Sequence, residues 1–424
     1  MKAPFLAMGI DLGTSGVRIA LINERKELIH TAQMSYPRGL SICKDWEKCT
    51  IELIQNIPSQ LKKLLKACAV DGTSGTLVAC DSNGAALGDA LPYYMNCIEQ
   101  HKSLAEILPD GGPTSSTNSS LARALHLQKQ FQQSLLFRHQ ADWVTGWLLG
   151  NWRWGEEANN LRMGWNPISK LWPSKLYDPS WQKSLPQIVQ SGTTLARISS
   201  KNAAQLGLPE DLLVIAGTTD SNAAVLSASP EADDGLTVLG STIVVKRFVE
   251  KPLNGFGVTN HRLLNRWICG GASNSGGAVL KKLFSDHAIK ELSQQIDPEL
   301  ESGLNLRPMP FRGERFPIND PNLEPIMTPR PVSDSLYLHG ILEGLARIES
   351  ESWQKLIALG ALPPKRIITI GGGAKNPQWR RIREKITGYP IRTCLKSPAE
   401  GVALIALQAI TKTNEPQNLS RTTS

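Results

Sequence analysis

A short pattern of residues occurs twice in this chain of 424 residues, once in each half. Leu12-Gly13-Thr14-Ser15 lies between two apolar stretches, and so does Leu239-Gly240-Ser241-Thr242. Each copy is typical of two strands joined by a tight turn, because glycine tolerates the positive φ that such a corner requires. The repetition predicts a duplicated domain, with a cleft between the two halves.

The length of the chain agrees with a duplication. A single hydrophobic core usually stops growing at about 250–300 residues. We therefore expect one domain at 1–227, a second at 228–412 and a polar tail at 413–424. Hydrophobic residues make up 41% of the chain and charged residues 20%, as in ordinary globular domains. No apolar run approaches the ~18 residues of a membrane span, and Asp11 interrupts the apolar N-terminal stretch, which favours a first strand over a signal peptide.

The charge and cysteine content narrow the possible functions. Lys and Arg number 46 and Asp and Glu 38, a net charge of +8. Because these charges are scattered, a solvated surface is favoured over a nucleic-acid interface. The seven cysteines include no Cys-x-x-Cys pair, which argues against a disulfide framework and a zinc site. They indicate a reducing compartment, and we expect a cytoplasmic protein.

The spacing of apolar residues predicts further helices and strands. Helices are expected at 47–65, 119–133, 140–149, 220–227 and 334–359, and from Pro377. Strands are expected at 212–217 and 366–370, and the proline-rich segment 305–332 is expected to be a long loop. Several of the eleven tryptophans gather at 143–172, where core packing is favoured over stacking on a ligand.

Asp11 ends the first apolar stretch and precedes the turn 13–16. An acid at the end of an apolar strand requires a partner for its charge, such as a divalent cation or a ligand hydroxyl. The hydroxyls and amides of the turn would then face phosphate oxygens. A plain hairpin, with Asp11 hydrogen-bonded to the turn, explains the same residues equally well.

Asp220 follows the apolar stretch 212–217, within Gly217-Thr218-Thr219-Asp220-Ser221-Asn222. Asp is well suited to cap a helix at its N-terminus, and by itself the motif favours this structural role. The alternative is a general base, because phosphoryl transfer needs a group that orients the acceptor hydroxyl and accepts its proton.

Three glycines, 371–373, lie between a predicted strand and a predicted helix. They would allow the backbone to approach a ligand closely, and Asn376 and Pro377 suit the start of a helix whose free N–H groups attract anions. The segment is neither G-x-x-x-x-G-K-[ST] nor G-x-G-x-x-G, and a simple turn is an equal alternative.

Taken together, the order and spacing of these segments resemble the FGGY carbohydrate kinases, and through them the actin-like ATPases. Segment 142–164, which contains DWVTGWLLG and NNLRMG, also resembles the N-terminal domain of that family. The resemblance spans the chain from residue 6 to residue 410 and implies an α/β fold of two ribonuclease-H-like domains, of the actin/hexokinase type, flanking a cleft. The main matching segments are 11–18 (DLGTSGVR), 217–225 (GTTDSNAAV), 239–244 (LGSTIV), 269–280 (CGGASNSGGAVL), 370–379 (IGGGAKNPQW) and 400–406 (EGVALIA).

The resemblance implies an enzyme that uses ATP and Mg²⁺ and a small sugar as acceptor. Asp220 matches the catalytic base, and Asp11 would bind Mg²⁺, directly or through water, and help to orient the sugar. The residues implied in sugar binding are Asp11, Thr73, Ser74 and Asp220. Those implied in binding the phosphates and the adenine are Gly13, Thr14, Ser15, Gly240, Ser241, Thr242, Gly372, Gly373, Asn376 and Trp379.

Two segments depart from the family pattern. Many members have Gln-Met-His where this chain has 70–78 (VDGTSGTLV), which is closer to the Asp-Ala-Thr of ribulokinase-type members. A usual Trp-x-Asp-x-Arg is replaced by 94–98 (YMNCI). The compact chain is similar to the cyanobacterial and plant kinases assigned to D-ribulose. The resemblance thus implies a kinase that forms D-ribulose 5-phosphate, with D-xylulose or another small ketose or polyol as the alternative.

Two functions of other classes compete with this hypothesis. A catalytically silent actin-like protein would bind nucleotide without phosphoryl transfer, and the presence of both Asp11 and Asp220 argues against it. Nucleic-acid binding through the basic charge would predict salt-dependent retention on DNA. We expect ATP and a small sugar as the partners, with neither nucleic acid nor a membrane, and either a monomer or a homodimer.

Overall fold

The computed structural model describes residues 4–109, 113–131 and 135–413, so the predicted polar tail lies outside the described residues except for Thr413. The described chain forms two compact units. Unit 1 holds the residues up to Ser227, the short segment Arg262–Asn265 and the chain from Ser397 onward. Unit 2 holds Ala228–His261 and Arg266–Lys396. None of the described helices is long and apolar enough to cross a membrane.

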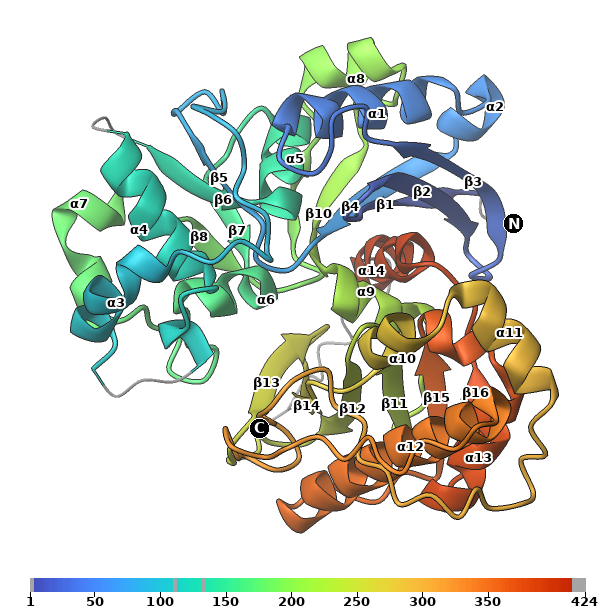
Figure 1. Ribbon diagram of the computed structural model, residues 1–424. Helices are drawn as coiled ribbons and strands as arrows, with labels where there is room; N and C mark the ends of the chain where they lie inside the picture. Colours follow the sequence, from blue (N-terminus) through green and yellow to red (C-terminus); the bar gives the residue numbers. More distant parts are fainter. Residues whose placement is uncertain (1–3, 110–112, 132–134, 414–424) are drawn as a thin grey trace, which may run out of the picture. The chain divides into compact units, whose positions relative to one another are not determined.

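Unit 1 is built on a six-stranded sheet in the order β3-β2-β1-β4-β10-β9 (Figure 1). Strand β1 is antiparallel to β2 and parallel to β4, which is in turn parallel to β10. The strands are β1 (Leu6–Leu12), β2 (Gly16–Asn23), β3 (Leu28–Ser35), β4 (Leu65–Gly72), β9 (Thr194–Arg197) and β10 (Leu213–Thr219).

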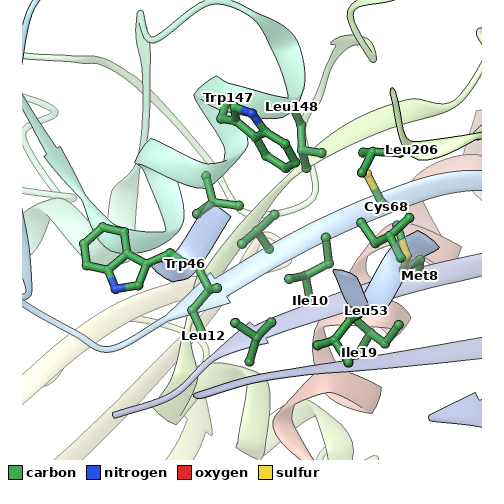
Figure 2. Packing of buried hydrophobic residues seen from close by; sticks show 14 of the residues in the cluster. Met8, Ile10, Leu12, Ile19, Trp46, Leu53, Cys68, Trp147, Leu148 and Leu206 are labelled. Carbon is green, nitrogen blue, oxygen red and sulfur yellow. The ribbon is translucent and has the colours of Figure 1, made fainter. Parts of the chain in front are cut away.

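Helices cover both faces of this sheet, which explains why β1 is buried along its whole length. One face packs against α1 (Cys43–Gln55), α5 (Gln140–Leu149) and α8 (Ser200–Leu206). Figure 2 shows side chains of this core, in which Met8, Ile10 and Leu12 of β1 meet tryptophans and leucines of the helices. Trp143 and Trp147 are buried here, as predicted for core packing.

The opposite face packs against α14 (Pro398–Thr413), which corrects the expected domain boundaries. The sequence placed this helix in the second domain, whereas it belongs to unit 1. Val402, Ala403 and Ile405 bury their side chains against the small residues of β1 and β4. Any side chain at Gly9 would collide with the backbone at Ala399, so the close contact of helix and strand depends on that glycine.

Between β4 and β10 the chain inserts a smaller lobe with its own apolar cluster. The predicted helix 119–133 is observed here as Ser120–Gln130, and Ser119 caps it by accepting a hydrogen bond from the amide of Ala122. The elements of this lobe are β5 (Leu77–Cys80), α3 (His101–Ile107), α4 (Ser120–Gln130), β6 (Leu136–His139), β7 (Trp154–Glu156), α6 (Glu157–Asn160), α7 (Pro179–Gln182) and β8 (Gln187–Val189).

A second prediction needs correction in unit 1. Residues 47–65 do not form one helix, because α1 ends at Gln55 and a short helix α2 (Ser59–Lys62) follows Pro58. Proline has no backbone N–H to donate and disfavours helical geometry in the residue before it, so a break at Pro58 is expected. Strand β4 then begins at Leu65, the last residue of the expected helix.

Unit 2 repeats the central arrangement of unit 1 in a sheet of order β13-β14-β12-β11-β15-β16. Strand β11 is antiparallel to β12 and parallel to β15, and β15 is parallel to β16. The predicted duplication is therefore confirmed by strand order and direction. The strands are β11 (Asp234–Leu239), β12 (Ile243–Val249), β13 (Val258–Leu263), β14 (Arg266–Ala272), β15 (Arg366–Ile370) and β16 (Ile391–Thr393).

Helices of unit 2 pack on this sheet through a core that includes Leu239, Ile243 and Trp379. The expected long helix is observed as α12 (Asp334–Ala358). The expected loop 305–332 contains only isolated bridges, such as Arg307 with Ile326. The helices of unit 2 are α10 (Gly277–Leu283), α11 (Asp286–Gln294), α12 and α13 (Pro377–Thr387).

Candidate active site

Three neighbouring parallel strands of unit 1 lead to aspartates at the same edge of the sheet. Asp11 of β1 lies directly opposite Asp71 of β4, and Thr218 of β10 lies opposite Asp71 from the other side. Helix α9 (Asp220–Ser227) begins two residues after Thr218, as the sequence predicted. The carboxyl ends of parallel strands are the usual ligand-binding edge of an α/β sheet.

Asp71 is the most deeply buried of these acids. Its exposed fraction is 0%, and among the described residues no N–H or hydroxyl group donates a hydrogen bond to either carboxylate oxygen. Burial raises the pKa of Asp71 well above its ordinary value, and the nearby charges of Asp11 and Asp220 raise it further. A buried carboxylate in this position requires a proton or a cation.

Asp11 connects Asp71 to the surface. It is 6% exposed, and a guanidinium nitrogen of Arg18 lies 3.7 Å from its Oδ2. Burial raises the pKa of Asp11, while a hydrogen bond with Asp71 and the charge of Arg18 act in the opposite direction. Two carboxylates can hydrogen-bond only if one carries a proton, so the pair either shares a proton or faces a bound cation.

Asp71 was not among the site acids predicted from the sequence, which were Asp11 and Asp220. The sequence did contain a signal for Asp71, because this acid follows the mostly apolar stretch 65–70 just as Asp11 follows the apolar residues before it. What the sequence lacked was the register that places Asp71 opposite Asp11, 60 positions earlier in the chain.

Asp220 is half-buried at the first position of α9, and its Oδ1 accepts a hydrogen bond of 2.6 Å from the amide of Ser221. The capping role, which the motif by itself favoured for Asp220, is taken by the preceding residue. Thr219 Oγ1 accepts a bond of 3.3 Å from the amide of Asn222, the geometry of an N-cap. A carboxylate in the first turn of a helix is stabilised by the helix dipole.

Thr73 and Ser74 lie in the turn after β4, in different surroundings. Thr73 is 1% exposed, and its Oγ1 bonds to Gln140 Oε1 at 2.7 Å and to Thr76 Oγ1 at 2.6 Å. Ser74 is half-buried, and its hydroxyl makes no hydrogen bond to another described residue. Thr73 thus supports the turn, whereas Ser74 is the better placed to contact a ligand.

Gly13, Thr14 and Ser15 form the turn between β1 and β2, where the amide of Gly13 donates to the carbonyl of Gly16 at 2.9 Å. Thr14 and Ser15 are exposed, so their hydroxyls are accessible. They follow Asp11 directly, and the structure therefore brings them to the same edge of unit 1.

The predicted nucleotide residues of unit 2 also meet at one sheet edge. Strand β11 leads into the turn 240–242 and its parallel neighbour β15 leads into the glycines, with Val238 opposite Ile370. Gly240 and Ser241 are exposed, and their carbonyls accept hydrogen bonds of 2.9 and 3.0 Å from the amides of Gly277 and Ala278.

The triple glycine makes this edge possible. Gly371 has φ +98°, and a Cβ there would lie 2.6 Å from the carbonyl oxygen of Leu239. A Cβ at Gly372 would meet no atom within 4 Å, so the backbone there borders open space. Asn376 Oδ1 caps α13 by accepting a bond of 3.0 Å from the amide of Trp379.

The buried position of Trp379 differs from the exposed position expected of a side chain that lines an adenine pocket. Its side chain is 2% exposed and lies in the core of unit 2. A Cβ on Gly373 would lie 2.5 Å from the indole ring, which shows that the tryptophan packs closely against the glycine loop. Its indole Nε1 is buried without a hydrogen-bond partner.

The acidic edge of unit 1 fits a divalent cation. Mg²⁺ prefers oxygen ligands and is usually bound through one or two carboxylates while it keeps several waters. Asp11 offers a carboxylate with a small exposed surface, and the two unpartnered oxygens of Asp71 lie behind it. These residues would hold such an ion.

Comparison with known proteins agrees with this geometry. Residues 237–410 match the model of the FGGY family of carbohydrate kinases, C-terminal domain. The xylulose kinase of Staphylococcus xylosus is 23% identical over 438 residues, which cover 94% of this chain and 90% of that protein.

Solved structures reproduce the fold. A kinase from Brucella ovis described as a xyloylose kinase has a TM-score of 0.81 at 18% identity, over 96% of this chain and 91% of that one. The glycerol kinase of Plasmodium falciparum with ADP has a TM-score of 0.81 at 15% identity, over 96% and 90%. The predicted α/β fold class of actin/hexokinase type is therefore confirmed. This chain thus matches the C-terminal domain of the FGGY family of carbohydrate kinases over residues 237–410, and it is similar along most of its length to proteins described as xylulose kinases.

Proposed function

We propose that this protein is a carbohydrate kinase that transfers the γ-phosphoryl group of ATP to the terminal hydroxyl of a pentulose. The observation that carries the proposal is the convergence of Asp11, Asp71 and Asp220 at one edge of unit 1. Phosphoryl transfer requires an oriented hydroxyl, a proton acceptor and compensation of the phosphate charge, and these carboxylates suit the first two tasks directly.

Each residue has a distinct part in this proposal. Asp220, half-buried at the start of α9, accepts the proton of the sugar hydroxyl as the new P–O bond forms. Asp11 orients the sugar and binds Mg²⁺, directly or through water, and bound Mg²⁺ supplies charge neutralisation on the phosphates. Asp71 is too deeply buried to touch the sugar and instead fixes the position of Asp11.

The proposed nucleotide site lies in unit 2. Exposed Gly240 and Ser241, with Thr242 and the open backbone at Gly372, offer amides and hydroxyls to phosphate oxygens and room for a close approach. The exposed Thr14 and Ser15 of unit 1 offer further hydroxyls. Gly373 and Asn376 complete the loop, which Trp379 supports.

Two pentuloses are candidate acceptors. D-Ribulose is favoured by the turn after β4, in which Ser74 offers a half-buried hydroxyl where many family members have Gln-Met-His. D-Xylulose is favoured by the relatives, since several curated proteins similar to this chain are xylulose kinases. We propose D-ribulose as the preferred substrate and D-xylulose as the alternative.

The test is a comparison of kcat/KM for D-ribulose, D-xylulose, glycerol and gluconate, with ADP release as the readout. A higher value for D-ribulose supports the preferred substrate, and a higher value for D-xylulose selects the alternative. Sugar-independent ATP hydrolysis or nucleotide binding without turnover for all four compounds would instead favour a silent actin-like protein.

A further inference from the structure

A small cavity lies behind the acidic edge of unit 1, enclosed by β4, β10, α5 and α6. Its volume is ≈ 10 Å³, about the room that one water molecule occupies. Val70 and Gly217 form part of its wall, and the polar side chains of Asp142, Glu156 and Asn159 face it from the other elements.

Two oxygen atoms of these side chains lack a partner. Glu156 Oε1 and Asn159 Oδ1 are buried without a hydrogen bond, and the two residues are 3% and 1% exposed. Their remaining polar atoms are satisfied, because Glu156 Oε2 accepts bonds from the amide of Asn159 at 3.0 Å and from its Nδ2 at 3.3 Å. Asn159 Oδ1 is an acceptor, and so is Glu156 Oε1 when the acid is ionised, so the missing partner is a donor or a cation unless Glu156 itself carries a proton.

Asp142 adds a second carboxylate to the cavity. Its Oδ1 accepts a bond of 2.9 Å from the amide of Glu156, and its Oδ2 accepts one of 3.2 Å from Asn160 Nδ2. Among the residues that the structure describes, no lysine, arginine or histidine lines the cavity. His139 Nδ1 lies 3.7 Å from Asp142 Oδ2 and has no hydrogen bond to a described residue. A concentration of buried oxygens of this kind is costly unless a proton or a positive charge compensates it.

We propose that this cavity binds one dehydrated monovalent cation, K⁺ or Na⁺, through Glu156, Asn159 and Asp142. The size of the cavity excludes Mg²⁺ with the waters that it retains. Burial raises the pKa of Glu156 well above its ordinary value, so this acid takes up a proton unless a cation compensates its charge. A lone water beside a protonated Glu156 is therefore the alternative that the experiment must exclude.

The position of the site links it to the proposed reaction. Val70 precedes Asp71, and Gly217 lies three residues before Asp220, so an ion in the cavity would brace the ends of β4 and β10. We therefore expect kcat to depend on the monovalent cation. This consequence rests on the proposed kinase function, whereas binding of the ion does not.

The experiment measures the melting temperature of the full chain in N-methyl-D-glucamine chloride, with KCl or NaCl substituted at constant ionic strength. A ligand that binds only the folded state stabilises it in a saturable way, and we expect a rise of about 2–4 °C at saturation. Glu156→Gln should abolish the rise, since the amide can keep the bond to Asn159 but carries no charge.

Glu157→Gln is the matched control, because this neighbouring carboxylate is also buried but does not line the cavity. It should keep the response to K⁺. Crystals of the wild-type protein soaked in Rb⁺ provide a second readout that does not depend on the folding of a variant, with an anomalous peak expected at the cavity. Equal melting temperatures in all salts and no Rb⁺ peak would overturn the proposal and leave a single water there. Cation-dependent melting without sugar phosphorylation would separate this site from a failed kinase assignment.

Discussion

The two sheets share the order and direction of their central strands but differ in the residues at the strand ends. In unit 1 the facing pair on the two parallel strands is Asp11 and Asp71, and the next strand leads to Asp220. In unit 2 the pair at the corresponding place is Val238 and Ile370. After these apolar residues the chain continues into exposed glycines rather than into acids.

This difference indicates a division of labour within a duplicated scaffold. Buried carboxylates suit proton transfer and cation binding, because burial and mutual repulsion disfavour their charged form unless a proton or a metal compensates the charge. Glycine turns suit an anionic ligand, because they bring backbone amides close to it without side-chain obstruction. The proposed kinase needs both kinds of edge, and each unit supplies one of them.

The strongest test of the acidic edge is Asp220→Asn. Loss of a general base typically lowers the rate by about 10²–10⁴, and we expect kcat to fall by that factor with the melting temperature and ATP binding retained. Steady-state kinetics and nucleotide titration measure the two effects. Thr219→Ala is the control, since it removes the helix cap and should reduce stability more than turnover. Normal kcat in Asp220→Asn would contradict the base assignment.

The glycine edge is tested by Gly372→Ala. No atom lies within 4 Å of the added methyl group, so the protein should fold with an unchanged melting temperature. If a nucleotide lies against this backbone, the methyl group should raise KM for ATP by about tenfold, equivalent to about 1.4 kcal/mol of lost contact, while KM for the sugar stays the same. An unchanged KM for ATP would show that the ligand of unit 2 does not approach Gly372.

Much of the glycine edge could be predicted from sequence, because its signals are local. The turn at 240–242, the three glycines and the cap at Asn376 are all short segments whose geometry follows from their own residues. The start of α9 at Asp220 is of the same kind. The supporting place of Trp379 could not be read in this way, since it depends on packing against Leu239 and Gly373.

The acidic edge was only partly predictable, for the opposite reason. Asp71 lies at the site because its strand, β4, pairs with β1, which is far away in sequence. No local pattern specifies the register of that pairing. Helix α14 was assigned to the wrong unit because its apolar face, which includes Val402 and Ile405, fits any sheet, and only the close contact with Gly9 shows which one it covers. The orphan oxygens of Glu156 and Asn159 are likewise visible only in three dimensions.

The cost of burying acids gives a third test, Asp71→Asn, measured on metal-free protein in EDTA. The pKa of Asp71 is raised in the folded state, so the folded protein holds a proton that the unfolded chain releases above pH ~4. The free energy of unfolding should therefore fall as pH rises from about 4 toward the raised pKa. Asp71→Asn should flatten this slope and be more stable than wild type by about 1–2 kcal/mol at pH 8, with little difference at pH 4. Denaturant titrations across this range measure it, and parallel curves for the two proteins would contradict the buried, raised-pKa state.

The smallest expected effect is that of Ser74→Ala, and it distinguishes the two residues of the turn after β4. Ser74 is half-buried and its hydroxyl makes no hydrogen bond to another described residue, whereas the Thr73 hydroxyl bonds to Gln140 and Thr76. A net hydrogen bond contributes about 0.5–1.5 kcal/mol, so Ser74→Ala should raise KM for D-ribulose by about two- to tenfold and leave KM for ATP and the melting temperature unchanged.

D-Ribulose and D-xylulose differ only at the C3 hydroxyl, and a site that bonds this hydroxyl rejects the epimer. If Ser74 reads C3, the variant should lose part of its discrimination between the two pentuloses as well. Thr73→Ser is the control, because it keeps the hydroxyl that holds Gln140. An equal rise of KM for both sugars would place Ser74 in contact with a part that they share, and no rise for either would remove it from the sugar site.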